Sequence, residues 1–333
     1  MIFYQVNRIL YKPYVIYKFL RKVHTETLPS SNILYPLRNR GLLKVAGDDA
    51  SVFLQGLITN DMNHFEEGAK SVYAMFLNNK GRVLYDTLIH KWGAESSFLI
   101  ECDRKLITIL QRHLKLYKLK RKVDIEDINK DYSIYALIAL NAPDISDDKI
   151  NVYKDPRLTD LGYRIISSVD AKDSEVAQTV GKDVTEGDED GYKYLRYKLG
   201  VSEGSDDLPP GTSFPLEANC DYLHGVSFHK GCYIGQELTA RVHHTGVVRK
   251  RIMPLKFTET ISNIEQDSVI SASNNPKSNL GKLKGFVNNY GLGLIRTKEA
   301  LDAKTLKVAN YSAEALKPSW WPIEAPKEVP KNE

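Results

Sequence analysis

The chain has few cysteines, and no two of them have the spacing of a metal-binding pair. It contains three in 333 residues, Cys102, Cys220 and Cys232. A disulfide scaffold needs a paired set, so this odd and sparse set favours a reducing compartment. The absence of a Cys-x-x-Cys pair also excludes a complete iron–sulfur motif built from neighbouring residues, and we predict no resident metal site.

Long apolar runs and internal repeats are also missing. No uninterrupted apolar stretch approaches the roughly 20 residues that a membrane-spanning helix needs, so we predict no integral membrane segment. With 42% hydrophobic and 26% charged residues, the composition is that of a globular chain. The length of 333 residues predicts two domains, or one domain with an appended module.

Excess charge is confined to the first residues. The chain has 46 Lys and Arg against 42 Asp and Glu, a net charge of +4. Residues 1–27 contain five of the basic residues and one acid, so they account for the whole excess. The remainder is neutral, which argues against a broad nucleic-acid surface and against a nucleic-acid partner.

The amino-terminal segment is basic and rich in Ile, Phe, Tyr, Leu and Val, and no acid precedes Glu26. Its basic residues are interspersed, so it has no apolar block of the secretory type. We predict that residues 1–28 are a mitochondrial targeting segment and that the mature protein lies in the mitochondrial matrix. The alternative is an amino-terminal segment that is disordered or forms an interfacial helix.

Apolar spacing predicts sheets and helices in residues 29–244. Asp48 or Asp49 is placed to cap a helix with apolar residues Val52, Phe53, Leu57 and Ile58. Residues 72–76 and 83–89 read as strands joined by a turn at Asn78-Asn79-Lys80-Gly81, and residues 98–101 as a third strand. Asp103 caps a second helix, whose apolar side is Leu106, Ile107, Leu110, Leu114 and Tyr117. A strand at 132–140 completes a pattern typical of an α+β fold, and the acidic, glycine-containing run 181–191 reads as a linker.

The pattern changes after residue 244. Residues 248–257, 268–273, 280–287 and 292–297 read as short strands separated by Asn-, Pro- and Gly-rich turns. We predict a small antiparallel β-barrel-like module over 245–322. Residues 323–333 are rich in proline and charge, and we expect a disordered tail.

The segment 104–122 contains eight basic residues and no acid. One interpretation is a face that binds phosphate or a polyglutamate. The other is a solvated helix face whose lysines extend over apolar surface. The acidic run at 183–190 offers neutralising partners in sequence.

A single cysteine between two glycines is the strongest candidate for chemistry. It lies in Lys230-Gly231-Cys232-Tyr233-Ile234-Gly235-Gln236-Glu237. Glycine permits backbone angles and close approaches that a side chain forbids. Positive charge from His229, Lys230 or Arg241 near the sulfur would favour the reactive thiolate. The alternative interpretation is a buried structural cysteine.

Several ordered motifs resemble the YgfZ-type folate-binding family, which is related to the glycine-cleavage aminomethyltransferase. The resemblance is closest to mitochondrial members that act as iron–sulfur cluster assembly factors. It is carried by 225–241, which includes the cysteine motif, and by Gln55-Gly56-Leu57-Ile58-Thr59-Asn60-Asp61. Asp207-Leu208-Pro209-Pro210-Gly211 and Pro215-Leu216-Glu217-Ala218-Asn219 also match, and the likeness runs from about residue 34 to about residue 317.

The resemblance implies an aminomethyltransferase-like fold, with sheet-and-helix subdomains around a central cavity that binds tetrahydrofolate. A flat pterin ring binds in an aromatic slot that also offers a few polar groups. The residues carried over as candidates for this site are Asn60, Asp61, Tyr85, Tyr163, Tyr194, Arg196, Lys230, Gly231, Tyr233, Gly235, Gln236, Glu237 and Arg241. For the aromatic residues, the competing interpretation is a core or interface position.

Two departures disfavour aminomethyl transfer. The enzyme branch has Gly-Gly-x-x-Asp-Asp on its second strand, and here Gly81-Arg82-Val83-Leu84-Tyr85-Asp86 replaces one acid with Tyr85. Asp86 remains a weak candidate for proton transfer, and loss of a positioned acid or base costs about two to four orders of magnitude in rate. The enzyme branch also has an acid within the motif Leu-Arg-x-Glu-x-Gly. Lys198 occupies that position here, so the charge offered to a pterin is reversed.

Cys232 is therefore the predicted functional residue, through transient contact with an iron–sulfur cluster. Thiolates are good ligands for such clusters. Cys220, His224, His243 and His244 are further candidate ligands, although adjacent imidazoles usually point apart. The family's role implies A-type iron–sulfur carrier proteins and four-iron client proteins as partners, and an assembly factor rather than a transferase. A functional aminomethyltransferase and a scaffold without folate binding are the alternatives.

Overall fold

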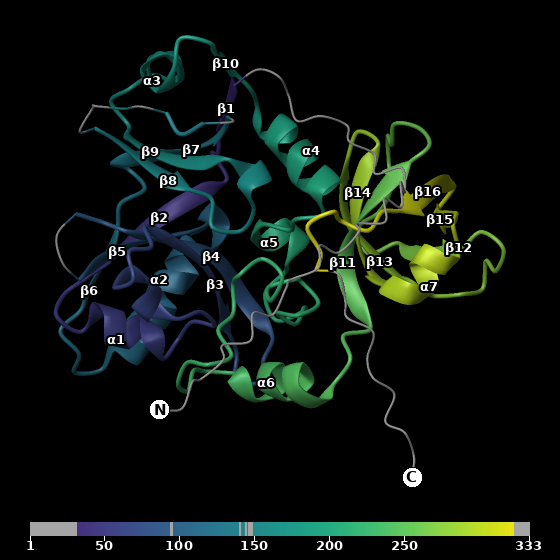
Figure 1. Cartoon of the computed structure of the whole chain (residues 1–333), viewed down its shortest axis with the longest axis horizontal. Coiled ribbons are helices and arrows are strands. Elements are labelled where there is room, and N and C mark those ends of the chain that lie inside the picture. The colour runs from purple at the N-terminus through teal and green to yellow at the C-terminus, as the bar shows by residue number, and fades with distance from the viewer. Residues whose placement is uncertain (1–31, 94–95, 140, 144, 146–148, 323–333) are drawn as a thin grey trace, which may run out of the picture.

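The computed structural model describes residues 32–93, 96–139, 141–143, 145 and 149–322. The predicted targeting segment 1–28 and tail 323–333 lie outside them. Figure 1 shows two sheets with their helices on one side of the molecule and a barrel on the other. The structure confirms the α+β prediction.

The first sheet is antiparallel, with the order β3-β4-β5-β2-β6. Its strands are β2 (Arg40–Ala46), β3 (Ser71–Leu77), β4 (Val83–Lys91), β5 (Ser97–Asp103) and β6 (Asp124–Asp127). The predicted hairpin is confirmed, since the Asn78 side chain accepts from the backbone N–H groups of Lys80 and Arg82, and Gly81 has φ +75°. This φ lies in the left-handed region that glycine tolerates.

Two helices, α1 (Ala50–Gln55) and α2 (Ile107–Lys118), pack on one face of this sheet. Their buried apolar residues include Phe53, Leu110 and Leu114. The predicted cap Asp103 is confirmed, because its carboxylate accepts from Lys105 N at 2.8 Å in the short 3₁₀ helix Arg104–Leu106 that precedes α2. A further 3₁₀ helix, Met62–Phe65, follows α1.

Three details of the helix predictions are wrong. Asp49 stands before α1, but its side chain accepts from Lys122 N instead of capping α1. Val52 and Tyr117 are exposed, because the apolar stripes of these short helices are narrower than the sequence pattern suggests.

The second sheet has the order β10-β1-β7-β9-β8. Its strands are β1 (Asn32–Pro36), β7 (Tyr132–Ile138), β8 (Ile150–Lys154), β9 (Tyr163–Ser168) and β10 (Val184–Glu186), with the 3₁₀ helix Thr159–Leu161 between β8 and β9. Helix α3 (Asp173–Val180) covers one face, and the other face shares a core with the first sheet. The linker prediction for 181–191 is wrong, since this run forms β10 and the start of α4 (Glu189–Leu199).

The carboxy-terminal module is a closed barrel in the order β11-β14-β13-β12-β15-β16, as the barrel prediction requires. Its strands are β11 (Lys250–Phe257), β12 (Val269–Ala272), β13 (Gly281–Val287), β14 (Tyr290–Arg296), β15 (Leu306–Val308) and β16 (Tyr311–Ala315), with α7 (Thr297–Asp302) after β14. The prediction missed β15 and β16, which close the barrel through the β11–β16 pair.

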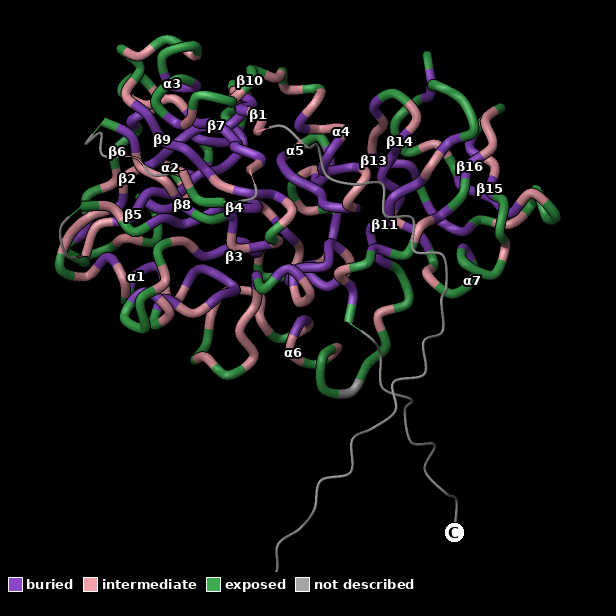
Figure 2. Tube along the Cα trace, turned by 45° about the horizontal axis from the view of Figure 1, so that its top comes forward, coloured by how far each residue is buried: buried purple, intermediate pink, exposed green. Residues whose placement is uncertain are grey.

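Helices α4, α5 (Gly204–Asp207) and α6 (Gln236–Thr245) lie between the sheets and the barrel or beneath them (Figure 1). Figure 2 shows buried residues concentrated on the strands, whereas α6 is mostly intermediate or exposed. No helix among the described residues is long and apolar enough to cross a membrane.

Candidate functional site

Cys232 is the one exposed thiol of the three cysteines. Cys102 and Cys220 are buried, and burial raises the pKa of both thiols above the ordinary value. A raised pKa keeps these two groups in the unreactive thiol form. The loop before α6 therefore presents the single cysteine that a partner molecule can reach.

Lys230 anchors this loop to the end of α1. Its Nζ donates to the backbone carbonyls of Gln55 at 2.7 Å, Ile58 at 2.8 Å and Asn60 at 2.5 Å. Burial lowers the pKa of Lys230 to about 8, and the nearby Asp61 opposes that shift. An ammonium has three N–H donors and all are used here, so Lys230 fixes the position of the loop and has no donor left for the Cys232 sulfur.

The two glycines that flank Cys232 differ. Gly235 has φ +80°, and a Cβ there would lie 2.3 Å from the Asn78 carbonyl oxygen. Glycine is required at this position because both the backbone angle and the close approach exclude a side chain. A Cβ on Gly231 would meet nothing within 4 Å, so the predicted steric need for glycine is supported at Gly235 alone.

The remaining motif residues shape the turn into α6. The Gln236 side chain accepts from Tyr233 N at 3.1 Å, and Ile234 N donates to Gly56 O at 3.2 Å. The Tyr233 ring is half-buried and lies 5.1 Å from Lys230 Nζ. Glu237 and Arg241 are exposed on α6. Together these contacts place Cys232 on a short loop held at both ends.

The side chains around Cys232 do not assemble a metal centre. Across the described part of the chain, no group of three or more His, Cys, Asp or Glu side chains is placed to hold a metal ion. His243 stacks on Phe228 with ring centroids 3.5 Å apart and its ring contacts that of His244, while Cys220 is buried. The site offers one exposed thiol rather than a ligand set.

A second candidate site is a central cavity of about 900 Å³ between the two sheets, the segment before α6 and the chain end after the barrel. A neighbouring cavity of about 300 Å³ shares Ser71, Pro156 and His224 with it. The lining of the larger cavity includes charged and aromatic side chains, among them Lys70, Lys154, Asp160, Asp221, Tyr222 and Trp320. Its volume is in the range of small-molecule sites.

Two hydroxyl groups of the lining residues lack partners. Ser71 Oγ and Tyr73 Oη are buried, and neither has a hydrogen-bond partner among the described residues. His224, which lines both cavities, has φ +58°, an uncommon angle for a residue other than glycine. The Asn60 side chain donates to the Tyr73 and His224 carbonyls at 2.7 and 2.8 Å. A buried hydroxyl without a partner is costly unless a ligand or water pairs with it.

The structure brings few of the predicted cofactor residues to this cavity. Asn60 lines the smaller cavity, and Asp61 caps the 3₁₀ helix that follows it. Burial would raise the pKa of Asp61, but hydrogen bonds from Asn63 N and Gln55 lower it. Tyr85 lies instead in the core beneath α2, where the centroids of its ring and the His113 ring are 5.7 Å apart.

Three further candidates also lie away from the cavity lining. Tyr163 packs on the α3 side of the second sheet, and Tyr194 packs edge-on against Tyr290 at 5.4 Å. Arg196 is buried, where it donates to Val201 O at 3.0 Å and to Asp207 at 2.8 Å. The cavity residues Ser71 and Trp320 were missed, and His224 was predicted as a cluster ligand instead of a cavity residue. Ser71 and His224 carry no distinctive local pattern, whereas the Trp320-Trp321 pair offered a signal.

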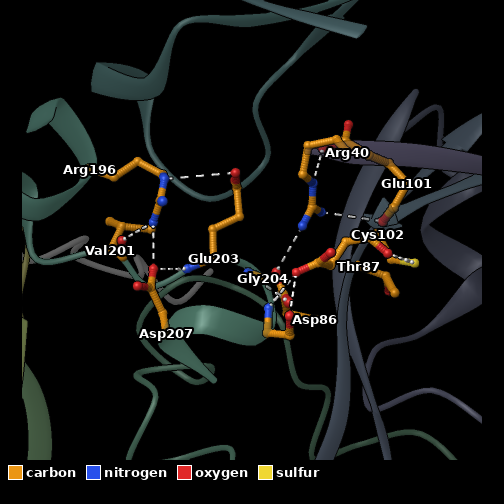
Figure 3. A network of polar contacts seen from close by, with 12 residues as sticks. Arg40, Asp86, Thr87, Glu101, Cys102, Arg196, Val201, Glu203, Gly204 and Asp207 are labelled. Atoms are coloured by element: carbon orange, nitrogen blue, oxygen red, sulfur yellow. Dashed lines mark hydrogen bonds and ion pairs between the residues drawn. The ribbon is translucent and has the colours of Figure 1, made fainter. Parts of the chain in front are cut away.

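A buried network of ion pairs joins α4 and α5 to both sheets. Figure 3 shows the part of it that lies between these helices and the first sheet. Glu203 lies at its centre, with carboxylate contacts to Arg164 at 2.6 Å, Arg157 at 2.8 Å and Arg196 at 3.7 Å. Burial would raise the pKa of Glu203, but the surrounding arginines hold it well below its usual range. In the same way Arg164 and Arg40 outweigh burial and lower the pKa of Glu101.

Asp86, the candidate for proton transfer, belongs to this network. Its carboxylate accepts from Gly204 N at 3.0 Å and lies 3.5 Å from Arg40 Nη1. Burial raises the pKa of Asp86, an effect that Arg40 opposes. Asp86 is not among the residues that line the two cavities, so its position is that of a structural carboxylate.

Comparisons with known proteins agree with this architecture. The GCVT N-terminal domain model matches residues 27–151, and the CAF17 C-terminal beta-barrel domain model matches residues 249–323. The mouse protein named "Iron-sulfur cluster assembly factor IBA57, mitochondrial" is 35% identical over 317 residues, 87% of this chain and 86% of its own length. The chain belongs to the IBA57 family.

Other IBA57 relatives give the same result. The human IBA57 protein is 35% identical over 311 residues, which cover 86% of this chain and 85% of the human protein. The homologue from Mycosarcoma maydis is 40% identical over 235 residues, which cover 66% of this chain and 56% of that protein. All three relatives are named mitochondrial iron–sulfur cluster assembly factors.

A solved structure shows that this chain has the aminomethyltransferase fold. The glycine cleavage system aminomethyltransferase T from Bartonella henselae superposes with a TM-score of 0.68 over 86% of this chain and 85% of that chain, at 14% sequence identity. At this identity the likeness establishes the fold alone.

Proposed function

We propose that the protein is an iron–sulfur cluster assembly factor of the mitochondrial matrix that assists the maturation of four-iron proteins. The observation that carries this proposal is the exposed Cys232 on a loop anchored by Lys230. The names of relatives at 35% identity support a role in cluster assembly and in mitochondria. A-type iron–sulfur carrier proteins are the proposed partners, and aconitase and lipoate synthase are representative clients.

The chemistry requires a shared cluster. One thiolate is a good iron ligand but cannot hold a cluster alone, so the other ligands come from the carrier protein. The cluster is cargo in this proposal, and Cys232 contacts it during transfer.

Replacing Cys232 with serine is expected to abolish this function while leaving the fold intact, because serine is nearly isosteric and the side chain is exposed. The test is rescue of cells that lack the protein, with aconitase activity and protein lipoylation as readouts. A two-iron enzyme and glycine cleavage serve as controls. Full rescue by Cys232→Ser would show that the thiol is not required. If cells that lack the protein keep active cluster enzymes but lose glycine cleavage, the protein is an aminomethyltransferase.

We also propose that tetrahydrofolate binds in the central cavity. The cavity's volume, its aromatic and charged lining and the unpaired hydroxyls of Ser71 and Tyr73 fit a ligand with a flat ring and several polar edges. Ser71, Tyr73 and Trp320 would hold the ring, and Lys70 or Lys154 would pair with the carboxylates. Bound folate would supply a one-carbon carrier; Asp86 lies elsewhere, in the buried network.

Loss of either hydroxyl is expected to weaken tetrahydrofolate binding by about two- to tenfold, since a hydrogen bond contributes about 0.5–1.5 kcal/mol. The variants are Ser71→Ala and Tyr73→Phe, and calorimetric titration under anaerobic conditions measures the affinity. Tyr194→Phe is the matched control because Tyr194 packs against Tyr290 instead of lining the cavity. If the wild-type protein shows no saturable binding of tetrahydrofolate, the folate proposal fails. The remaining interpretation is then a scaffold in which Cys232 acts without folate.

A further inference from the structure

Exposed apolar residues gather on one side of the molecule. Of the nine large apolar residues with exposed side chains in the described part of the chain, five lie on α1, on α2 or directly after α2. They are Val52, Ile109, Leu116, Tyr117 and Leu119. Single exposed apolar residues are ordinary, but a cluster marks an interaction site. Figure 1 shows α1 and α2 at the end of the molecule away from the barrel.

Helix α2 presents two of these residues, Ile109 and Leu116, opposite its buried side. Ile107, Leu110 and Leu114 face the sheet. At 100° per residue, Ile109 and Leu116 fall on the opposite face, with exposed fractions of 52% and 72%. This apolar stripe faces away from the core, and none of the residues that the structure describes covers it.

Leu119 extends this stripe from an unfavourable backbone position. It follows α2 with φ +49° and ψ −121°, and it is 86% exposed. A bulky residue with positive φ is strained, and such strain concentrates at functional segments. The strained backbone places the Leu119 side chain in solvent. A turn with a purely structural role would not need an apolar residue at this position.

Cations without partners surround the stripe. Arg112, Lys115, Lys118, Lys120 and Arg121 make no ion pair or hydrogen bond with any described residue through their side chains, and four of these residues are exposed, whereas Lys118 is intermediate. Lys105 pairs with Asp206 and Lys122 with Asp48.

The acids among the described residues form no ion pair with these cations. In the acidic run at 183–190, Asp188 caps α4 and Glu189 accepts from Asn39 N. Asp124, Glu126 and Asp127 lie on β6, beside the flank of α2 on which Gln111 donates to Ile125 O. Gln111 lies about 100° around the helix from Arg112, so the β6 acids flank the stripe without covering it.

We propose that the α2 surface, defined as Ile109, Arg112, Lys115, Leu116, Leu119, Lys120 and Arg121, docks on an anionic phospholipid bilayer. Apolar side chains that insert shallowly, ringed by Lys and Arg, are the composition of an interfacial helix. A run of eight basic residues without an acid suits a diffuse negative surface better than a patterned protein partner. Residues 1–27 are themselves basic, so charge disfavours that segment as the occupant.

Sedimentation of the full-length protein with vesicles tests the proposal. We expect binding to phosphatidylcholine vesicles that contain phosphatidylglycerol, and none to pure phosphatidylcholine. Each neutralised basic residue should weaken the partition coefficient about fivefold, so Arg112→Gln with Lys115→Gln should weaken it about 25-fold. Leu116→Ser with Leu119→Ser should weaken it about tenfold.

Control variants separate docking from general charge. Lys282→Gln with Lys298→Gln removes two exposed cations from the barrel module and should leave the partition coefficient unchanged. Raising salt from about 0.1 M to about 1 M should release the protein, because the screening length falls from about 10 Å to about 3 Å. Equal losses in the α2 and barrel variants would overturn the proposal. So would saturable binding of the α2 surface to an acidic protein with no binding to vesicles.

Discussion

Glu203→Gln is expected to lower the free energy of unfolding by about 3–5 kcal/mol, the cost of removing one partner from a buried ion pair. The carboxylate contacts three buried arginines, Arg157, Arg164 and Arg196. An amide keeps the shape but removes the charge, so three guanidinium groups lose their shared counterion in a place that water does not reach. Urea denaturation measures the change.

The matched control for this variant is Glu299→Gln. Glu299 forms an exposed pair with Arg296 at 3.6 Å, and such pairs contribute about 0–1 kcal/mol. A loss below about 1 kcal/mol for Glu203→Gln would show that the network is not the source of stability that its geometry implies.

The same carboxylate predicts acid lability. Its folded pKa is lowered well below the ordinary value of 4.5, so between these two values the unfolded state binds more protons than the folded state. The contribution of Glu203 to stability is therefore complete above about pH 4.5 and is lost as pH falls toward the folded pKa. The unfolding free energy of wild type should fall more steeply with acid than that of Glu203→Gln, and parallel pH profiles would contradict this.

Gly235→Ala is expected to destabilise the Cys232 loop and α6 by at least about 2 kcal/mol, because positive φ costs a residue with a Cβ about 1–2 kcal/mol and the Cβ also meets the Asn78 carbonyl. Since α6 has few buried side chains, the loss should be local to α6. Amide hydrogen exchange over 236–245 should accelerate more than tenfold.

Gly231→Ala provides the internal control for Gly235→Ala. Its Cβ meets nothing within 4 Å, so exchange and stability should stay within about 0.5 kcal/mol of wild type. If the two alanine variants behave alike, the backbone at Gly235 is not what fixes the loop. If Gly235→Ala also fails to rescue cluster enzymes, the position of Cys232 matters as well as its chemistry.

Local pattern predicted the elements better than it predicted their partners. The Asn78–Gly81 turn predicted the β3–β4 hairpin, because turn chemistry acts over a few residues. The strand β7 follows β6 of the first sheet in sequence but pairs with β1 and β9 in the other sheet. Nothing local in β7 encodes that choice, which depends on which apolar faces meet in the core.

The Cys232 loop carries a local signal in the sequence, and the cavity carries none. The glycines around Cys232 are a local signal, and the exposure of the thiol agrees with it. The cavity lining comes from segments far apart in the chain, such as Ser71, His224 and Trp320. With 19 tyrosines in the sequence, residue type alone could not distinguish Tyr73, which lines the smaller neighbouring cavity, from Tyr85, which packs beneath α2.

The position of the last strand has a consequence for synthesis. β16 closes the barrel by pairing with β11. Trp320 donates from its ring N–H to Leu199 O, 121 residues earlier, and its side chain forms part of the cavity wall. Translation runs from the amino terminus, so a nascent chain carries an open β11 edge and an unfinished cavity until β16 and Trp320 have left the ribosome. Closure of the barrel and of the cavity therefore follows the synthesis of every element before β16, and chains that stop before β16 expose an unpaired strand to chaperones and to aggregation.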